Sequence, residues 1–477
     1  MTTATTSAGT ISSAGIGSGL DVNSIVTQLM AIEQKPLTVL QTKASTIQTT
    51  VSEYGKIKSA VSTLNDLSVK LASGTTWAQT VSSTSDATKV TASTNGAATG
   101  TYTVEVQALA SVQTLASSTF AAASPTPGAG TLHIELGTWG AGQTSFTPKT
   151  GATAVDITIA ATDTLTDVRD KINASGAGVT AMIMTDASGS RLLMRSTATG
   201  ADSAFRTSGV ASLAFDPSAG VTGMTQTQAA ANAAATVNGL AVTSTSNTLA
   251  NIVDGLTLNL VSLTVPATPT TITVAIDTAS LQKTMADFAS AYSALMTMFA
   301  NDTKYDATTK KAGLLQGDSA VTGLQRQLRA IAGGTTSAST TFTYLSNAGF
   351  QIQRDGTMTV DATKLTNALG NLPELKKMFA NSNATDPMAD GFAKRFRGFT
   401  DGVLGINGSL TTRTAGLSDE LKRNQTNQDN LSIRLAATEK RMRAQYTALD
   451  ATMAKLNSTS AYLTQQITAM NATAASK

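Results

Sequence analysis

Apolar residues near both ends of the chain recur at the three- and four-residue intervals of a helix, whereas those in the middle alternate. Asp21 occupies an N-cap position ahead of a first helical segment, which Pro36 interrupts. A second segment keeps the helical spacing as far as Leu71, and Gly74 follows it as a stop signal. The apolar positions of this second segment include Leu40, Ile47, Val51, Tyr54 and Val61.

The alternating pattern of the middle, from about Thr75 to Thr278, predicts antiparallel strands joined by Gly, Pro and Asn turns. One short helix is expected around Leu165, with Thr164 or Thr166 as its cap. Weak patterning from Phe205 to Ala235 predicts a long loop. The clearest alternating runs are Tyr102-Val104-Val106, Leu132-Ile134-Leu136, Val155-Ile157-Ile159, Leu256-Leu258-Leu260 and Ile272-Val274-Ile276. This span is long enough for two compact domains.

The helical period returns after Thr278, and three helices are expected before the C-terminal one. Between the second and third of these, Asp355-Gly356 separates two short alternating runs and predicts a hairpin with a type I′ turn. Asp361 then stands where it would cap the third helix. The buried positions expected in the three helices are Leu281, Met285, Phe288, Tyr292, Leu295 and Phe299, then Val321, Leu324, Leu328 and Ile331, then Leu365 and Leu369.

The last part of the chain has the most regular pattern, a row of residues that repeats every seven positions. Its members are Leu421, Gln428, Leu435, Met442, Leu449, Leu456, Leu463 and Met470. The positions three further on are mostly polar, so this helix is expected to present a narrow apolar seam rather than the two rows of a leucine zipper. Such a helix is marginal alone. It would pack either against the N-terminal helix of its own chain or against neighbouring subunits.

Composition narrows the classes of function. Only 14% of residues are charged, against about 25% in average globular proteins, which suits a subunit packed into a polymer or one that works outside the cell. The net charge is +3 and no basic tract occurs, so nucleic-acid binding is not expected. The absence of cysteine excludes disulfides and thiolate chemistry and suits export as an unfolded chain. The first ten residues lack the pattern of a cleaved secretory signal, and no apolar run reaches the ~20 residues of a membrane span.

Candidate catalytic and ligand-binding residues are scarce, so no enzyme activity, cofactor or metal is expected. The single histidine, His133, lies in an alternating apolar run and is interpreted as a strand residue rather than a base. The acidic residues of the middle region stand mostly beside Gly, Ser or Thr, where they suit turns and caps. The glycines of Gly15-Ile16-Gly17-Ser18-Gly19 follow no strand and precede no Lys-Ser/Thr pair, which favours a linker over a phosphate-binding loop.

Several stretches resemble those of a known family, in the family's order along the chain. The stretch from Gly17 to Leu37, GSGLDVNSIVTQLMAIEQKPL, and the stretch from Leu449 to Gln466, LDATMAKLNSTSAYLTQQ, resemble the N- and C-terminal signatures of the flagellar hook-associated protein 2 family, the filament cap. The inner stretch Val237-Asn238-Gly239, with Asp254-Gly255 after it, resembles a hairpin motif of cap proteins. Residues 167–200 resemble a repeat of flagellin and hook-associated proteins.

The pattern and the resemblance together predict an α+β multidomain fold, in which terminal helices form a helical-bundle or coiled-coil leg domain around two antiparallel β-rich domains. The expected divisions are a mobile leg segment of residues 1–40, a helical leg domain of 41–74 and 279–454, head domains within 75–278 with one inserted in the other at roughly 107–220, and a second mobile leg segment of 455–477. The predicted assembly seam consists of Leu40, Ile47, Val51, Tyr54, Val61, Leu435, Met442, Leu449, Leu456, Leu463 and Met470.

The resemblance implies a secreted structural protein at the distal tip of the flagellar filament, which leaves the cell through the flagellar type III export channel. It would promote flagellin folding and polymerisation and prevent leakage of exported flagellin. Its implied partners are other copies in a small pentameric or hexameric ring, flagellin, and an export chaperone before secretion. Two alternatives stay open at this point: another axial protein such as flagellin or a junction protein, and a tip adhesin that binds host mucin or other glycans.

Overall fold

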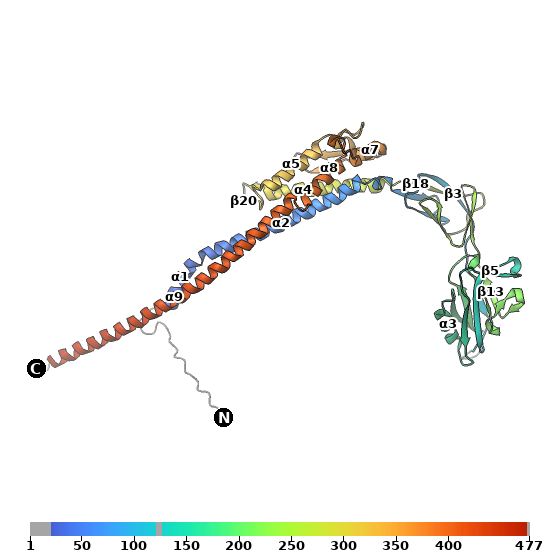
Figure 1. Ribbon diagram of the computed structural model, residues 1–477, viewed down its shortest axis with the longest axis horizontal. Coiled ribbons are helices and arrows are strands. Elements are labelled where there is room, and N and C mark those ends of the chain that lie inside the picture. The colour runs from blue at the N-terminus through green and yellow to red at the C-terminus, as the bar shows by residue number, and fades with distance from the viewer. Residues whose placement is uncertain (1–20, 121–125, 475–477) are drawn as a thin grey trace, which may run out of the picture. The chain divides into compact units, whose positions relative to one another are not determined.

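The structure of the protein, a computed structural model, describes residues 21–120 and 126–474 (Figure 1). These residues form two compact units. The helical unit combines the chain before Gly74 with the chain after Leu281, and the β unit is Gly74–Leu281. The α+β fold with helical ends around a β-rich middle is therefore confirmed.

The first two helices of the helical unit begin where the sequence predicts. Helix α1 (Val22–Glu33) starts after Asp21, whose carboxylate accepts a hydrogen bond of 2.9 Å from the Ser24 N–H. Helix α2 (Lys35–Ala72) has Pro36 in its first turn, where the missing N–H is not needed. The other helices of this unit are α4 (Thr278–Thr303), α5 (Ser319–Gly333), α6 (Ala362–Leu369), α7 (Leu372–Ala380), α8 (Phe392–Leu404) and α9 (Ser409–Ala474).

Helices α2, α4 and α8 enclose the aromatic core of the helical unit. The Phe396 ring on α8 lies edge-on to Phe288 and Tyr292 of α4, with ring centroids 5.1 and 5.9 Å apart. All three side chains are completely buried. Helix α2 runs beside α8 and α9, and its Ile57 and Leu64 are completely buried. The helices predicted around these apolar positions are confirmed.

Two small antiparallel ladders complete the helical unit. They are β19 (Tyr305–Asp306) with β20 (Lys311–Ala312), and β21 (Phe350–Ile352) with β22 (Met358–Val360). The predicted hairpin is present, but the prediction of a type I′ turn is wrong. A type I′ turn needs positive φ at both central residues, whereas Gly356 has φ 90° and Asp355 is not among the positive-φ residues. A five-residue connection therefore links the strands, closed by a 2.8 Å bond from the Gln353 N–H to the Thr357 carbonyl.

The β unit contains two separate hydrophobic cores. The first lies between a five-stranded antiparallel sheet, ordered β1-β18-β3-β14-β15, and a three-stranded sheet, ordered β16-β17-β2. Val104, Leu258 and Ile272 are among its buried residues. Its strands are β1 (Thr80–Thr84), β2 (Val90–Thr94), β3 (Gly100–Ala108), β14 (Ala233–Val237), β15 (Leu240–Ser244), β16 (Thr248–Val253), β17 (Leu256–Leu260) and β18 (Thr270–Ile276).

The second core is formed by the part of the chain between β3 and β14. Helix α3 (Leu165–Ala174), capped by Thr164 as predicted, buries Leu165, Val168 and Ile172 there. One sheet has the order β13-β4-β9-β8, and in the other β5 pairs with β10 on one side and with β6 and β7 on the other. The strands are β4 (Thr114–Ser117), β5 (Gly130–Trp139), β6 (Phe146–Pro148), β7 (Val155–Ile159), β8 (Val179–Asp186), β9 (Gly189–Ser196), β10 (Ala204–Ser208), β11 (Phe215–Asp216), β12 (Val221–Thr222) and β13 (Met224–Gln228).

The long loop predicted from Phe205 to Ala235 is wrong. Strands β10 to β14 occupy this stretch, and Phe205 is completely buried. All of these strands are only two to five residues long, too short to show a clear alternation, and β10 pairs with the distant β5. The sequence does mark the turn that follows: Asn238 and Gly239 both have positive φ, which gives the two-residue connection between Val237 and Leu240.

Candidate functional site

Helix α9 is the longest described element, and its N-terminal part is covered by other helices of the same unit. Figure 1 shows α2 and then α1 lying along α9, which continues past α1 towards the C terminus. A small apolar cluster joins α1 to α9, in which Val26 is completely buried. The members of the cluster are Val22, Val26, Met30 and Leu435, with Leu37, Leu431, Met442 and Tyr446 packed around them. The only polar side-chain contact found between α1 and α9 is a 2.9 Å hydrogen bond from Arg443 to Asn23, within the described residues.

A buried polar pair interrupts the apolar seam between α2 and α9. The Gln428 side-chain amide donates a hydrogen bond of 2.5 Å to the Asn424 side-chain oxygen and lies 3.4 Å from the Leu40 carbonyl. Both side chains are at least nine-tenths buried, and the Asn424 side-chain nitrogen has no partner among the described residues. Burial of these two side chains costs a desolvation free energy that apolar side chains at the same positions would not cost. The contact between α2 and α9 is therefore weaker than an entirely apolar contact.

Beyond Tyr446 the leucines of the heptad row on α9 are exposed, whereas Asp450 on the same stretch is buried. Leu449, Leu456, Leu463, Ile467 and Met470 expose 47% to 68% of their surface. A helix with a continuous apolar side and no partner is marginal in water, because most helical stability in proteins comes from packing that side. This end of α9 therefore presents a surface for a partner. We call residues 446–470 the terminal stripe.

The terminal stripe has further apolar residues on one flank of the heptad row. The positions four residues beyond the members of the heptad row are occupied by Tyr446, Met453, Ser460 and Ile467. All of these except Ser460 are apolar. The narrow seam expected from the polar residues at Thr452 and Thr459 stays a prediction, and these two residues lie on the opposite flank of the heptad row from Met453.

The structure divides the predicted seam residues into two groups. In the first group, Tyr54 and Val61 are completely buried, Ile47 and Leu435 are buried, and Leu40, Val51 and Met442 are half-buried, all within the helical unit. The second group, on the terminal stripe, is exposed: Leu449, Leu456, Leu463 and Met470. The first group is thus used for packing of the helical unit, whereas the side chains of the second group are exposed. A role of either group in assembly stays a prediction.

Tyr54 belongs to a polar network that the sequence analysis missed. Its hydroxyl donates a 2.7 Å hydrogen bond to the carboxylate of Asp318, which also accepts a 3.3 Å bond from Arg413. Asp318 caps α5 through the Ala320 N–H. Burial alone would raise the pKa of Asp318, but the bonds from Tyr54 and the Ala320 N–H outweigh it, and the pKa is lowered. Burial, and then Asp318, raise the pKa of Tyr54, so the hydroxyl keeps its proton and remains a donor.

Replacing Tyr54 with Phe is expected to lower the free energy of unfolding of the helical unit by about 1.5 to 3 kcal/mol, the usual range for a hydrogen bond to a charged group. Urea unfolding followed by circular dichroism at the helical band measures this change. Tyr305→Phe is the matched control, because Tyr305 is exposed in the same unit and should change stability by less than about 0.5 kcal/mol. Equal effects of the two variants would contradict the role given to the Tyr54–Asp318 bond.

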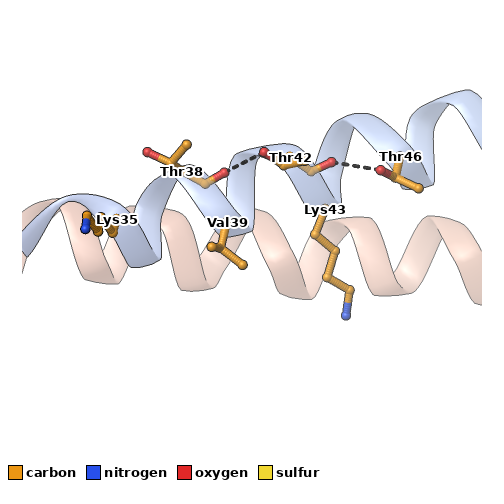
Figure 2. Close-up of a pocket in the computed structure, with 6 residues that line it drawn as sticks. All are labelled: Lys35, Thr38, Val39, Thr42, Lys43 and Thr46. Atoms are coloured by element: carbon orange, nitrogen blue, oxygen red, sulfur yellow. Dashed lines mark hydrogen bonds between the residues drawn. The ribbon is translucent and has the colours of Figure 1, made fainter. Parts of the chain in front are cut away.

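A shallow groove on α2 is a second open surface of the helical unit. Figure 2 shows its lining on one side of the helix. The Thr42 and Thr46 hydroxyls donate to the carbonyls of Thr38 and Thr42, at 2.9 and 3.0 Å, so their methyl groups give the groove its apolar lining. Lys43 is engaged in a 2.8 Å ion pair with Glu420 of α9. The groove is lined by Lys35, Thr38, Val39, Thr42, Lys43 and Thr46.

His133 lies in strand β5, as predicted. Its Nδ1 is 2.6 Å from a carboxylate oxygen of Asp156, the residue directly opposite on β7. This is an exposed cross-strand pair, Ser208 of β10 lies opposite His133 on the other side, and the chain has no second histidine. Among the described residues there is no group of three or more acidic or histidine side chains placed to hold a metal ion. Nor is any described helix both long and apolar enough to cross a membrane.

Comparison with family models places the chain among the proteins of the bacterial flagellum. Residues 18–113 match the N-terminal model of flagellar hook-associated protein 2, and residues 230–458 match its C-terminal model. Residues 142–198, which contain α3 and β8, match the flagellin hook IN motif. These matches overlap the terminal stretches and the inner repeat on which the resemblance rested, and the C-terminal match ends at residue 458, within the stretch 449–466.

Curated relatives agree with the family models over most of the chain. Flagellar hook-associated protein 2 of Escherichia coli is 33% identical over 378 residues, which are 75% of this chain and 78% of that protein. The B-type flagellar hook-associated protein 2 of Pseudomonas aeruginosa is 28% identical over 456 residues, which are 90% of this chain and 91% of that protein. The chain belongs to the flagellar hook-associated protein 2 family, and the family resemblance seen in the sequence is confirmed.

A solved structure gives the same result for the fold. The crystal structure of three domains of the flagellar cap protein from Escherichia coli matches with a TM-score of 0.59 and 29% identity, and covers 77% of this chain and 99% of that chain. The expected flagellar localisation is confirmed by these matches, since every protein named here is a flagellar one.

Proposed function

We propose that this chain is the structural, non-enzymatic cap at the distal tip of the flagellar filament, where it promotes flagellin folding and polymerisation and prevents exported flagellin from leaking into the medium. Membership of the hook-associated protein 2 family and likeness to a solved flagellar cap protein support this role. The single observation that carries the mechanism is the terminal stripe, in which Leu449, Leu456 and Leu463 at the end of α9 are exposed.

The cap would work as a small ring of five or six copies, reached after export as an unfolded chain with the help of an export chaperone. The absence of cysteine supports passage through a narrow channel, since no disulfide can form before export. Ordering of the leg helices only against a filament would let them adjust as each flagellin is inserted. The first twenty residues of the predicted mobile segment 1–40, and the last three of segment 455–477, lie outside the described residues.

We also propose the domain organisation expected from the sequence, with a helical leg domain and two head domains. The two compact units support the division between legs and head. The two cores of the β unit share no residue, and the second is built from chain that lies between β3 and β14, which supports an inserted head domain. Limited proteolysis should yield a stable fragment within residues 112–228, and cleavage inside that range at the same rate as elsewhere would contradict the insertion.

Deletion of the gene in its own bacterium tests the proposed function. The deletion strain should secrete flagellin that does not polymerise, and a plasmid copy of the chain should restore filaments. Loss of flagellin itself would leave nothing to secrete, so the rival assignment to flagellin gives the opposite result. Particle images of the purified full-length protein measure the number of copies in the ring.

A further inference from the structure

Two short segments of chain, residues 109–113 and 229–232, connect the two cores of the β unit. Both cores belong to the same compact unit. The segments pair with each other, since Ser111 and Ala231 exchange backbone hydrogen bonds of 2.9 and 3.2 Å. Domains of one chain usually move relative to one another unless further contacts hold them, so these two connections alone would act as a hinge.

A side-chain amide holds each end of the first connecting segment. At the first core, the Asn247 side chain accepts a 2.7 Å hydrogen bond from the Ala110 N–H and donates one of 2.9 Å to the Ala110 carbonyl. At the second core, the completely buried Gln113 side chain donates to the Phe205 carbonyl at 2.9 Å and accepts from the Phe205 N–H at 3.0 Å. Each amide satisfies both polar groups of one backbone residue, as a neighbouring strand would. The two residues between these positions therefore have little freedom to bend.

A loop of the second core, residues 197–203, reaches back to the first core, and we call it the docking loop. The Thr199 hydroxyl donates a 2.7 Å hydrogen bond to the carbonyl of Thr245, in the turn between β15 and β16. The Ala201 N–H donates to the side-chain oxygen of Asn232, in the second connecting segment, at 2.7 Å. The docking loop thus contacts the first core at a place away from both backbone connections.

Gly200 lies at the closest approach between the docking loop and the first core. It is buried, and its φ of 103° and ψ of 148° are a conformation that glycine adopts readily and other residues rarely adopt. A Cβ at this position would lie 2.6 Å from the Thr245 Cβ and 2.9 Å from the Thr245 carbonyl oxygen. Its N–H also donates a 3.2 Å hydrogen bond to the Ser111 carbonyl. Any side chain at Gly200 would therefore push the docking loop away from the turn.

We propose that the docking loop fixes the second core on the first, so that the two parts of the β unit move as one rigid body instead of swinging about their connections. The evidence is the agreement of three contacts: the paired segments, the amides at both ends of the first segment, and the docking loop with Gly200 against Thr245. This inference goes beyond the proposed function, which does not depend on whether the two parts move.

The test measures distances between nitroxide labels in the full-length chain, in which introduced cysteines are the only labelling sites. The pair Leu240→Cys on β15 and Met184→Cys on β8 spans the two cores; the pair Leu240→Cys and Val81→Cys lies on the two edge strands of one sheet and is the reference. All three positions are 48% to 75% exposed. Double electron–electron resonance should give distance distributions of equal width for the two pairs. A spanning pair at least about twofold wider would overturn the inference, since that is the behaviour of hinged domains.

Two variants should release the second core. Gly200→Ala should widen the spanning distribution at least about twofold and leave the reference pair unchanged, because it removes the close approach. Thr199→Val combined with Asn232→Ala should widen it in the same direction, because two hydrogen bonds to the docking loop are lost without backbone strain. Thr197→Val is the matched control, since its hydroxyl donates to the Gly178 carbonyl, within the second core.

The urea midpoint followed by tryptophan fluorescence shows whether Gly200→Ala keeps the β unit folded, since both tryptophans lie there. A folded Gly200→Ala variant with an unchanged spanning distribution would refute the role given to Gly200. If this variant lowers the midpoint, the combined Thr199→Val and Asn232→Ala variant decides, because it introduces no strained residue. A spanning distribution of that variant as narrow as the distribution of Thr197→Val would overturn the inference.

Discussion

A double variant with Leu449→Asp and Leu456→Asp is expected to abolish capping, so that a deletion strain carrying it secretes as much unpolymerised flagellin as the strain with no copy at all. Both leucines are exposed in the single chain, so folding should be unaffected. In an assembled state each carboxylate would be buried against an apolar surface, at a cost of several kcal/mol. Immunoblotting of flagellin in the culture medium measures the outcome.

Two controls make this result specific to the terminal stripe. Ile433→Asp lies on the same helix, away from the seam and 69% exposed, and should cap normally. The fluorescence of Trp77 and Trp139, the only tryptophans of the chain and both in the β unit, should be unchanged in the double variant. Normal capping by the double variant would show that the terminal stripe is not an assembly surface.

Truncation of Phe396 to Ala should have the largest effect on stability, lowering the free energy of unfolding of the helical unit by about 3 to 5 kcal/mol. The ring is completely buried between Phe288 and Tyr292, and its loss would leave a cavity in the centre of the core. Since domains are stable by only about 5 to 15 kcal/mol, this is a large fraction of the total. Urea unfolding followed by circular dichroism measures the change, because all the long helices belong to this unit.

The matched control for Phe396→Ala is Ile406→Ala, at a position of the same unit that is 92% exposed. It should change the free energy of unfolding by less than about 0.5 kcal/mol. The urea midpoint seen by tryptophan fluorescence should not move in either variant, since both tryptophans lie in the β unit. A loss below about 1 kcal/mol for Phe396→Ala would contradict the description of this core.

The helices and most long strands could be predicted from the sequence because their signals are local. Asp21 as a cap, Pro36 at a helix start and the periodic rows of α4 and α9 each depend on residues a few positions apart. Strands β10 to β14 could not be predicted, because they are short and are specified by pairing with distant strands such as β5 and β3.

Only part of the candidate site could be predicted from the sequence, for the same reason. The leucine row of α9 was predicted from its seven-residue spacing. The apolar residues Tyr446, Met453 and Ile467 on one flank of that row were not, because only the positions three residues beyond the row were compared. Tyr54 was grouped with the assembly residues because of its spacing alone. Its bond to Asp318, 264 positions away along the chain, leaves no local signal, and it shows that Tyr54 serves the core of the helical unit.

Electron microscopy of filaments that carry the gold-labelled protein tests the central claim most directly. The account predicts one cluster of label at the distal end of each filament and none along its length. Label along the whole filament would make the chain a flagellin, and label at the junction between hook and filament would make it a junction protein. Either of these results would contradict the assignment of this chain as the filament cap.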